Sequence, residues 1–75
     1  MIVGRKFQKL GSELKKARKE KGLTLKQTTQ LLGYGSQMSL LYIERGKRRI
    51  PLDKLAVICK LYDIRVGELL DKIYT

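Results

Sequence analysis

The residues best suited to chemistry in this sequence are basic, and they indicate a polyanionic partner. Seventeen Lys and Arg stand against only seven Asp and Glu, which gives a net charge of +10. The densest group is the run Lys47, Arg48 and Arg49. Because each basic side chain that neutralises a phosphate releases condensed counterions, nucleic acid is the commonest partner of such a surplus. The alternatives are a solvated basic loop and a surface charge that only keeps the protein in solution.

The residue types that most enzymes use are scarce. The sequence has no histidine and a single cysteine, and its seven carboxylates are scattered without the spacing of a metal site or of an acid and base pair. Cys59 lies in the apolar run LAVICKLY, where a small side chain packs well into a core. We therefore expect no enzymatic activity, no metal, no cofactor and no small-molecule ligand.

Length and hydropathy describe a small domain that does not cross a membrane. A chain of 75 residues buries only about 60 to 65% of its unfolded surface, so pairing with a second copy is a common source of added stability. No apolar run approaches the ~20 residues of a membrane span. The N-terminus also lacks the apolar stretch of a secretory signal, so we expect a cytoplasmic protein.

Helices separated by short turns are expected to position the basic residues. Apolar spacings of three and four, with glycine or proline breaks, predict helices over about 7–21, 25–32, 37–45, 51–62 and 66–74, after a basic arm at 1–6. Thr24 and Gln27 form a capping-box pattern at the start of the second helix, and Ser36 can cap the third. Gly33 and Gly35 permit a tight turn between these two helices.

The third predicted helix has two different sides. Leu40 and Ile43 fall on one side, which we expect to pack inward. The other side faces outward and carries the longer or more polar residues Gln37, Met38, Leu41, Tyr42 and Arg45. The sequence therefore predicts a helix, a tight turn and a second helix with an exposed face.

From about Leu10 to Leu70 the sequence resembles the Cro/CI-type helix-turn-helix family, also called the XRE family. The resemblance rests on GLT at the second helix, Leu32-Gly33 before the turn, IERG at the end of the third helix and Pro-Leu-Asp at the fourth. It implies an all-α, five-helix, lambda-repressor-like DNA-binding domain whose third helix enters the major groove. It also implies a transcriptional regulator, a repressor or controller, that binds double-stranded DNA at a palindromic operator as a homodimer in the nucleoid.

The resemblance assigns roles to particular residues. Base edges are expected to be contacted by Gln37, Met38, Leu41 and Tyr42, where Gln suits adenine and Met38 suits a thymine methyl group. The sugar-phosphate backbone is expected to be contacted by Thr24, Lys26, Ser36, Arg45, Lys47, Arg48 and Arg49. The N-terminal residues Arg5, Lys6 and Lys9 fit either a backbone-contacting arm or a solvated segment.

Two structural assignments also follow from the resemblance. Arg18 and Glu44 match an ion pair that ties the first helix to the third. The apolar surplus of the last helix matches a frequent dimer element, with Leu70, Ile73 and Tyr74 as interface residues. Leu69 is expected to pack inward instead.

Some positions depart from the family pattern. Leu25 replaces the usual Gln, which moves a phosphate contact to Lys26, the turn carries one extra residue, and Arg65 stands where a Ser or Thr cap is usual. Thr28 and Thr29 replace the usual Leu and Ala, and their hydroxyls are expected to bond to carbonyls one turn earlier.

A second hypothesis follows from the apolar residues of the second and third predicted helices. Exposure of Leu25, Leu31, Met38, Leu41 and Tyr42 would make this face more apolar than that of a usual DNA reader. The alternative to a regulator is therefore a protein-interaction module of the same fold, such as an antitoxin or an adaptor.

Overall fold

The computed structural model describes the backbone of residues 4–74 and the side chains of residues 8–74. These residues form five helices and no strand: α1 (Gly4–Glu20), α2 (Leu25–Leu32), α3 (Gln37–Glu44), α4 (Leu52–Leu61) and α5 (Val66–Tyr74). The expected all-α, five-helix architecture is therefore confirmed. None of these helices combines the length and apolar character that crossing a membrane requires.

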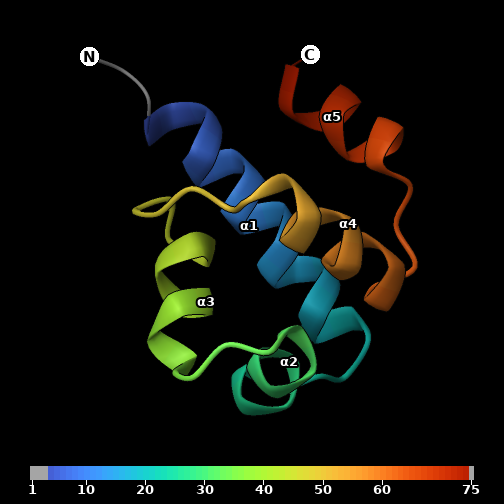
Figure 1. Ribbon diagram of the computed structural model, residues 1–75. Helices are drawn as coiled ribbons and strands as arrows, with labels where there is room; N and C mark the ends of the chain where they lie inside the picture. Colours follow the sequence, from blue (N-terminus) through green and yellow to red (C-terminus); the bar gives the residue numbers. More distant parts are fainter. Residues whose placement is uncertain (1–3, 75) are drawn as a thin grey trace.

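Helix α1 is the central element of the fold. It runs through the middle of the molecule, with α3 at one side, α2 at the bottom and α5 at the top (Figure 1). It packs against α3 and α5, while α2 packs against α3 and α4. The helix-turn-helix unit, α2 and α3, is thus held from behind by α1 and α4.

A single apolar core joins the five helices. Its buried side chains are Leu14, Leu32, Leu40, Ile43, Leu55, Ile58, Cys59, Tyr62, Leu69 and Ile73. The expected inward positions of Leu40, Ile43, Leu69 and Cys59 are therefore confirmed. Leu52, by contrast, is 79% exposed at the first turn of α4.

Two glycines allow α1 to lie directly against the end of α3. A Cβ atom on Gly11 would collide with the backbone carbonyl oxygens of Ile43 and Glu44. A Cβ atom on Gly46 would lie 2.5 Å from the Cα of Gln8, and Gly46 also has a left-handed φ of +73° that disfavours other residues. The position of α3 therefore depends on backbone-to-backbone contact with α1.

Helix α2 is fixed by its own polar side chains. The predicted capping box is confirmed, because Thr24 Oγ1 accepts from the Gln27 amide at 3.0 Å and Gln27 Oε1 accepts from the Thr24 amide at 2.9 Å. The hydroxyls of Thr28 and Thr29 donate to the carbonyls of Thr24 and Leu25 at 2.9 and 2.8 Å. Both threonines are buried, so hydrogen bonding one turn back satisfies the polar groups that replace apolar packing.

The helix ends differ from the sequence-based expectations in five places, two of which are the ends of α1 at Glu20 and of α4 at Leu61, each one residue earlier than expected. Helix α1 begins at Gly4, so residues 4–6 are helical rather than part of an arm, whereas residues 1–3 lie outside the described part. The side chains of Arg5, Lys6 and Phe7 also lie outside it. Pro51 precedes α4 with extended backbone (ψ 148°), and α3 ends at Glu44.

Of the two glycines in the turn between α2 and α3, Gly33 and Gly35, only Gly33 has a positive φ.

Candidate nucleic-acid interface

Each helix of the helix-turn-helix unit begins with a capping hydroxyl whose own hydrogen remains available for a further hydrogen bond. Thr24 accepts from an amide at the start of α2, and Ser36 Oγ accepts from the Met38 amide at 3.2 Å at the start of α3. Both residues are exposed. An accepting hydroxyl retains its own hydrogen as a donor, so each cap offers a hydrogen bond to an anionic oxygen outside the protein.

The outward face of α3 carries the residues expected to contact bases. Gln37 is exposed, Met38 is 44% exposed and Tyr42 is 40% exposed, whereas Leu41 is half-buried. Gln37 lines a small depression with the outward residues of α2, including Lys26 and Gln30. The structure therefore brings one polar and three largely apolar side chains together on a single helical face beside α2.

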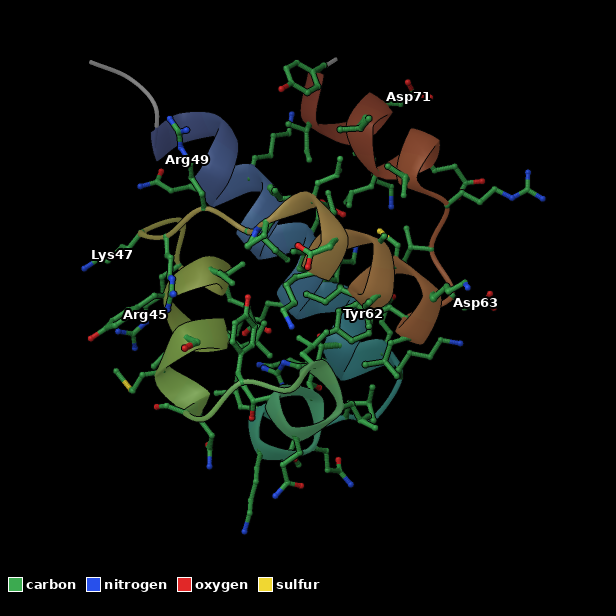
Figure 2. The ribbon with its side chains drawn as sticks, in the orientation of Figure 1. Arg45, Lys47, Arg49, Tyr62, Asp63 and Asp71 are labelled. Atoms are coloured by element: carbon green, nitrogen blue, oxygen red, sulfur yellow. The ribbon has the colours of Figure 1, made fainter. Side chains whose placement is uncertain are left out.

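Basic side chains gather at the C-terminal end of α3. Arg45 caps the helix and is exposed, as are Lys47, Arg48 and Arg49 in the following loop. Figure 2 shows Arg45, Lys47 and Arg49 along the edge of the molecule on which α3 lies, with Asp63 and Asp71 on the opposite side. Exposed basic side chains therefore border the outward face of α3 at the C-terminal end of this helix.

Arg48 is not simply a solvated loop residue. Its guanidinium donates to the Ser39 hydroxyl of α3 at 3.2 Å. Ser39 lies on the flank of α3 opposite Gln37, since residues 37 and 39 are about 200° apart on a helical wheel. The bond therefore holds a guanidinium along one edge of the exposed face.

The Arg18 and Glu44 side chains anchor α3 to α1. Arg18 donates to both Glu44 carboxylate oxygens, from Nε at 2.8 Å and from Nη2 at 3.3 Å, and from Nη1 to the Leu23 carbonyl at 2.8 Å. Both side chains are buried. This is the pair that the resemblance implies, and its two parallel bonds fix the orientation of α3 as well as its distance from α1.

Tyr62 lies beside this ion pair in the interior. Its hydroxyl has no hydrogen-bond partner among the described residues. Burial raises the pKa of Tyr62 to about 12, an effect that Glu44 reinforces and that Thr28 and Arg18 oppose. Burial also raises the pKa of the Cys59 thiol, so neither group is activated for chemistry.

Lys54 is a positioning residue that the sequence-based reasoning missed. From α4, its ammonium donates to the Leu32 carbonyl at the end of α2 at 2.8 Å. The same nitrogen lies 5.3 Å from the centre of the Tyr34 ring, within cation–π range. Lys54 therefore clamps the turn between α2 and α3, and no local sequence pattern marks a contact across 22 residues.

The apolar face is smaller than the sequence suggests. Leu25 is half-buried, and Leu31, although 59% exposed, lines a second shallow hollow with Leu23, Gln27 and Gln30, which shares only Gln30 with the depression beside Gln37. Only Met38, Leu41 and Tyr42 remain on the outward face of α3. This separation weakens the argument for a broad protein-binding surface.

The expected interface residues of α5 divide into two groups. Leu70 is 42% exposed and Tyr74 is exposed, so both can reach a second copy. Ile73 is only 7% exposed and belongs to the core, which corrects its assignment to an interface. The physical reason is that Ile73 follows the buried Leu69 by four residues and shares its face of the helix.

Comparison with known families decides the classification. A family model described as a helix-turn-helix domain matches residues 9–72. The chain belongs to this helix-turn-helix family. The resemblance to Cro/CI-type helix-turn-helix proteins is thereby confirmed.

Solved structures agree with this classification. Two crystal structures of the clp gene regulator ClgR from Corynebacterium glutamicum are each 26% identical to this chain and cover 92% of it. The alignments span 87% and 72% of the respective ClgR chains, with TM-scores of 0.81 and 0.83. No curated protein sequence matches the chain. These similarities support DNA binding and transcriptional regulation as the function of the domain.

Proposed function

We propose that this protein is a sequence-specific regulator that binds double-stranded DNA as a homodimer at a palindromic operator in the cytoplasm, and that it represses transcription. Helix α3 enters the major groove, and Gln37, Met38, Leu41 and Tyr42 meet the base edges. Occlusion of the polymerase from the promoter is the simplest route to repression.

One observation carries this proposal. The outward face of α3 is bordered by groups that suit phosphates: the capped starts of α2 and α3 on one side and the basic loop after α3 on the other. A duplex presents the same order, with base edges in the groove between two phosphate backbones. The backbone contacts are accordingly assigned to Thr24, Lys26, Ser36, Arg45, Lys47, Arg48 and Arg49.

The homodimer is supported by size and by the exposed apolar residues of α5. A chain of 75 residues has a small core, and Leu70 and Tyr74 lie on a surface that a second copy can cover. We expect Leu70→Asp to shift the sedimentation coefficient from dimer to monomer. Leu31→Asp is the matched control, because Leu31 is also exposed but lies on α2. A dimeric Leu70→Asp variant would remove α5 from the interface.

Selection of bound sequences from a random duplex library tests the function. We expect an enriched palindrome whose half-sites lie about one helical turn apart. A dimer that contacts some 6 to 10 phosphates is expected to lose roughly 10³- to 10⁵-fold in affinity between 50 and 200 mM salt. It should retain a specificity ratio above about 10³ over a scrambled duplex. Salt-sensitive binding without an enriched motif would contradict the base-reading role of α3.

Two variants separate base contacts from backbone contacts. Gln37→Ala is expected to weaken the selected site by about 1 to 3 kcal/mol and to relax specificity at one position. Lys47→Ala is expected to weaken all duplexes alike and to reduce the salt slope by about 1. Lys60→Ala is the control for Lys47→Ala, because Lys60 is exposed on α4 beside Asp63, on the opposite side of the molecule.

A protein-interaction module of the same fold, an antitoxin or adaptor, is the alternative function. Its support is the exposure of Met38 and Tyr42. If no duplex is selected, the same α3 face is the surface on which to map a protein partner.

A further inference from the structure

The outward side chains of α3 are mostly uncharged. From Gln37 to Tyr42 its outward side chains are one amide, one thioether, one partly buried aliphatic group and one phenol. The acidic residue of the helix, Glu44, is buried in its ion pair with Arg18. The first outward charge is Arg45, at the C-terminal cap. The central part of this face therefore carries no charged group.

The guanidinium groups near α3 are confined to its margin. Arg45 lies at the last turn, and Arg48 is drawn to the flank of the helix by its hydrogen bond to Ser39. Ser39 is itself half-buried on the side of α3 away from Gln37. The groups that could read guanine therefore border the face rather than occupy its centre.

The base pairs present different chemistry to such a face. Guanine offers two acceptors that suit Arg or Lys, and cytosine offers a donor that suits Asp or Glu. Adenine suits the amide of Gln, and thymine alone carries a methyl group that favours apolar contact. An uncharged face with one amide and several apolar groups suits A·T pairs better than G·C pairs, because its centre lacks the Arg or Lys that suits guanine and the carboxylate that suits cytosine.

On this basis we propose that the protein reads A·T-rich half-sites through the C5 methyl groups of thymine. Met38, Leu41 and Tyr42 contact thymine methyls, and Gln37 binds adenine. Guanine is read only at the edge of each half-site. This inference rests on the proposed function and adds the class of sequence that the same surface recognises.

The exposed apolar area explains why methyl groups are the expected targets. Met38 and Tyr42 leave large apolar surfaces in water in the free protein. In the major groove the thymine methyl is the principal apolar feature of the base edges. Contact with it removes apolar surface on both sides from water, which stabilises the complex in proportion to the area buried.

Replacement of thymine by deoxyuridine tests the proposal directly. Deoxyuridine keeps every base-pairing and groove hydrogen-bonding group of thymine and lacks only the methyl. The protein is titrated with its selected duplex and with duplexes in which single thymines are replaced symmetrically in both half-sites. Burial of one group the size of a methylene changes affinity by a factor of about four. We therefore expect about fourfold weaker binding for each contacted methyl and roughly 16-fold weaker binding for a symmetric pair.

A variant assigns the effect to a residue. In Met38→Ala the deoxyuridine substitution at the contacted position should no longer weaken binding, because the apolar partner of the methyl is gone. Leu31→Ala is the matched control, since Leu31 is an exposed apolar residue of α2 that lies away from this face. It should keep the full discrimination between thymine and deoxyuridine.

The outcomes distinguish this inference from the proposed function. Enrichment of a specific but G·C-rich half-site, or equal affinity for the thymine and deoxyuridine duplexes, overturns methyl reading and leaves sequence-specific binding intact. Failure to enrich any duplex overturns both. An A·T-rich motif with methyl discrimination that disappears in Met38→Ala supports both.

Discussion

Removal of the Glu44 carboxylate is expected to be the most damaging single change to the scaffold. In Glu44→Ala the buried Arg18 guanidinium keeps its bond to the Leu23 carbonyl but loses both bonds to carboxylate oxygens. Breaking a buried pair by removal of one partner costs about 3 to 5 kcal/mol, because a charge is left uncompensated. A domain of this length has a total stability of roughly 4 to 11 kcal/mol. The variant should therefore lose between about a quarter and all of its stability.

Urea titration followed by circular dichroism measures this loss. Both proteins are compared at one fixed concentration, because association with a second copy adds concentration-dependent stability. Thermal melting should show a midpoint lowered by more than about 12 °C, from at least 3 kcal/mol at about 4 °C per kcal/mol. Glu20→Ala is the control, because Glu20 is exposed at the end of α1, and it should change stability by less than about 0.5 kcal/mol.

A double variant identifies the cause of the loss. Arg18→Met combined with Glu44→Leu removes both charges and fills a similar volume, so it should recover most of the stability lost in Glu44→Ala. A loss below about 1 kcal/mol in Glu44→Ala would refute the argument that the pair is a buried anchor. A double variant as unstable as the single one would show that packing, rather than the unpaired charge, sets the cost.

Three further predictions concern the interior. Gly11→Ala should destabilise the fold in urea titration despite the better helix propensity of alanine, because its Cβ atom would collide with the α3 carbonyls. Gly67→Ala is the control: a Cβ atom there meets open space on α5, so this variant should be stabilised by up to about 1 kcal/mol. The pKa of Tyr62 is about 12 in the folded protein, against 10.0 when the side chain is exposed. The neutral phenol therefore stabilises the fold fully below pH 10. The free energy of unfolding should fall by about 2 to 3 kcal/mol as the pH rises to 12. Tyr62→Phe should abolish that part of the alkaline loss and leave neutral stability unchanged or slightly higher, since the buried hydroxyl lacks a partner. Cys59 should resist thiol reagents in the native protein and react only on unfolding, because it is buried with a raised pKa; rapid native reaction would contradict this.

The helices and their order could be predicted from the sequence because their signals are local. The capping box of Thr24 and Gln27 lies within four residues, and the inward side of α3 follows from the helical period alone. The sequence pattern predicts too late a start for α1, because no capping residue precedes Gly4 and glycine is a poor helix former. The sequence pattern also predicts Pro51 as the first residue of α4, a position that proline favours, whereas the helix begins one residue later.

The interactions between helices could not be predicted without a known relative. Nothing near Lys54 indicates that its ammonium reaches the end of α2, and nothing near Arg48 indicates a bond to Ser39. The burial of Ile73 is different, because it could have been inferred: a residue four positions after the inward Leu69 lies on the same face. The apolar surplus of α5 by itself indicates an interface, whereas the helical period indicates that Ile73 is buried.

The contacts that hold α3 in place do not involve the side chains on its outward face. Its place is set by the close approach of Gly11, the Arg18 and Glu44 pair and the Lys54 clamp on the preceding turn, none of which uses an outward side chain of α3. A surface held in this way needs little reorganisation on binding, which limits the entropic cost of association. On the proposed function, substitutions at Gln37 or Met38 should therefore alter the preferred sequence without altering the fold, and the specificity of the domain would change independently of its stability.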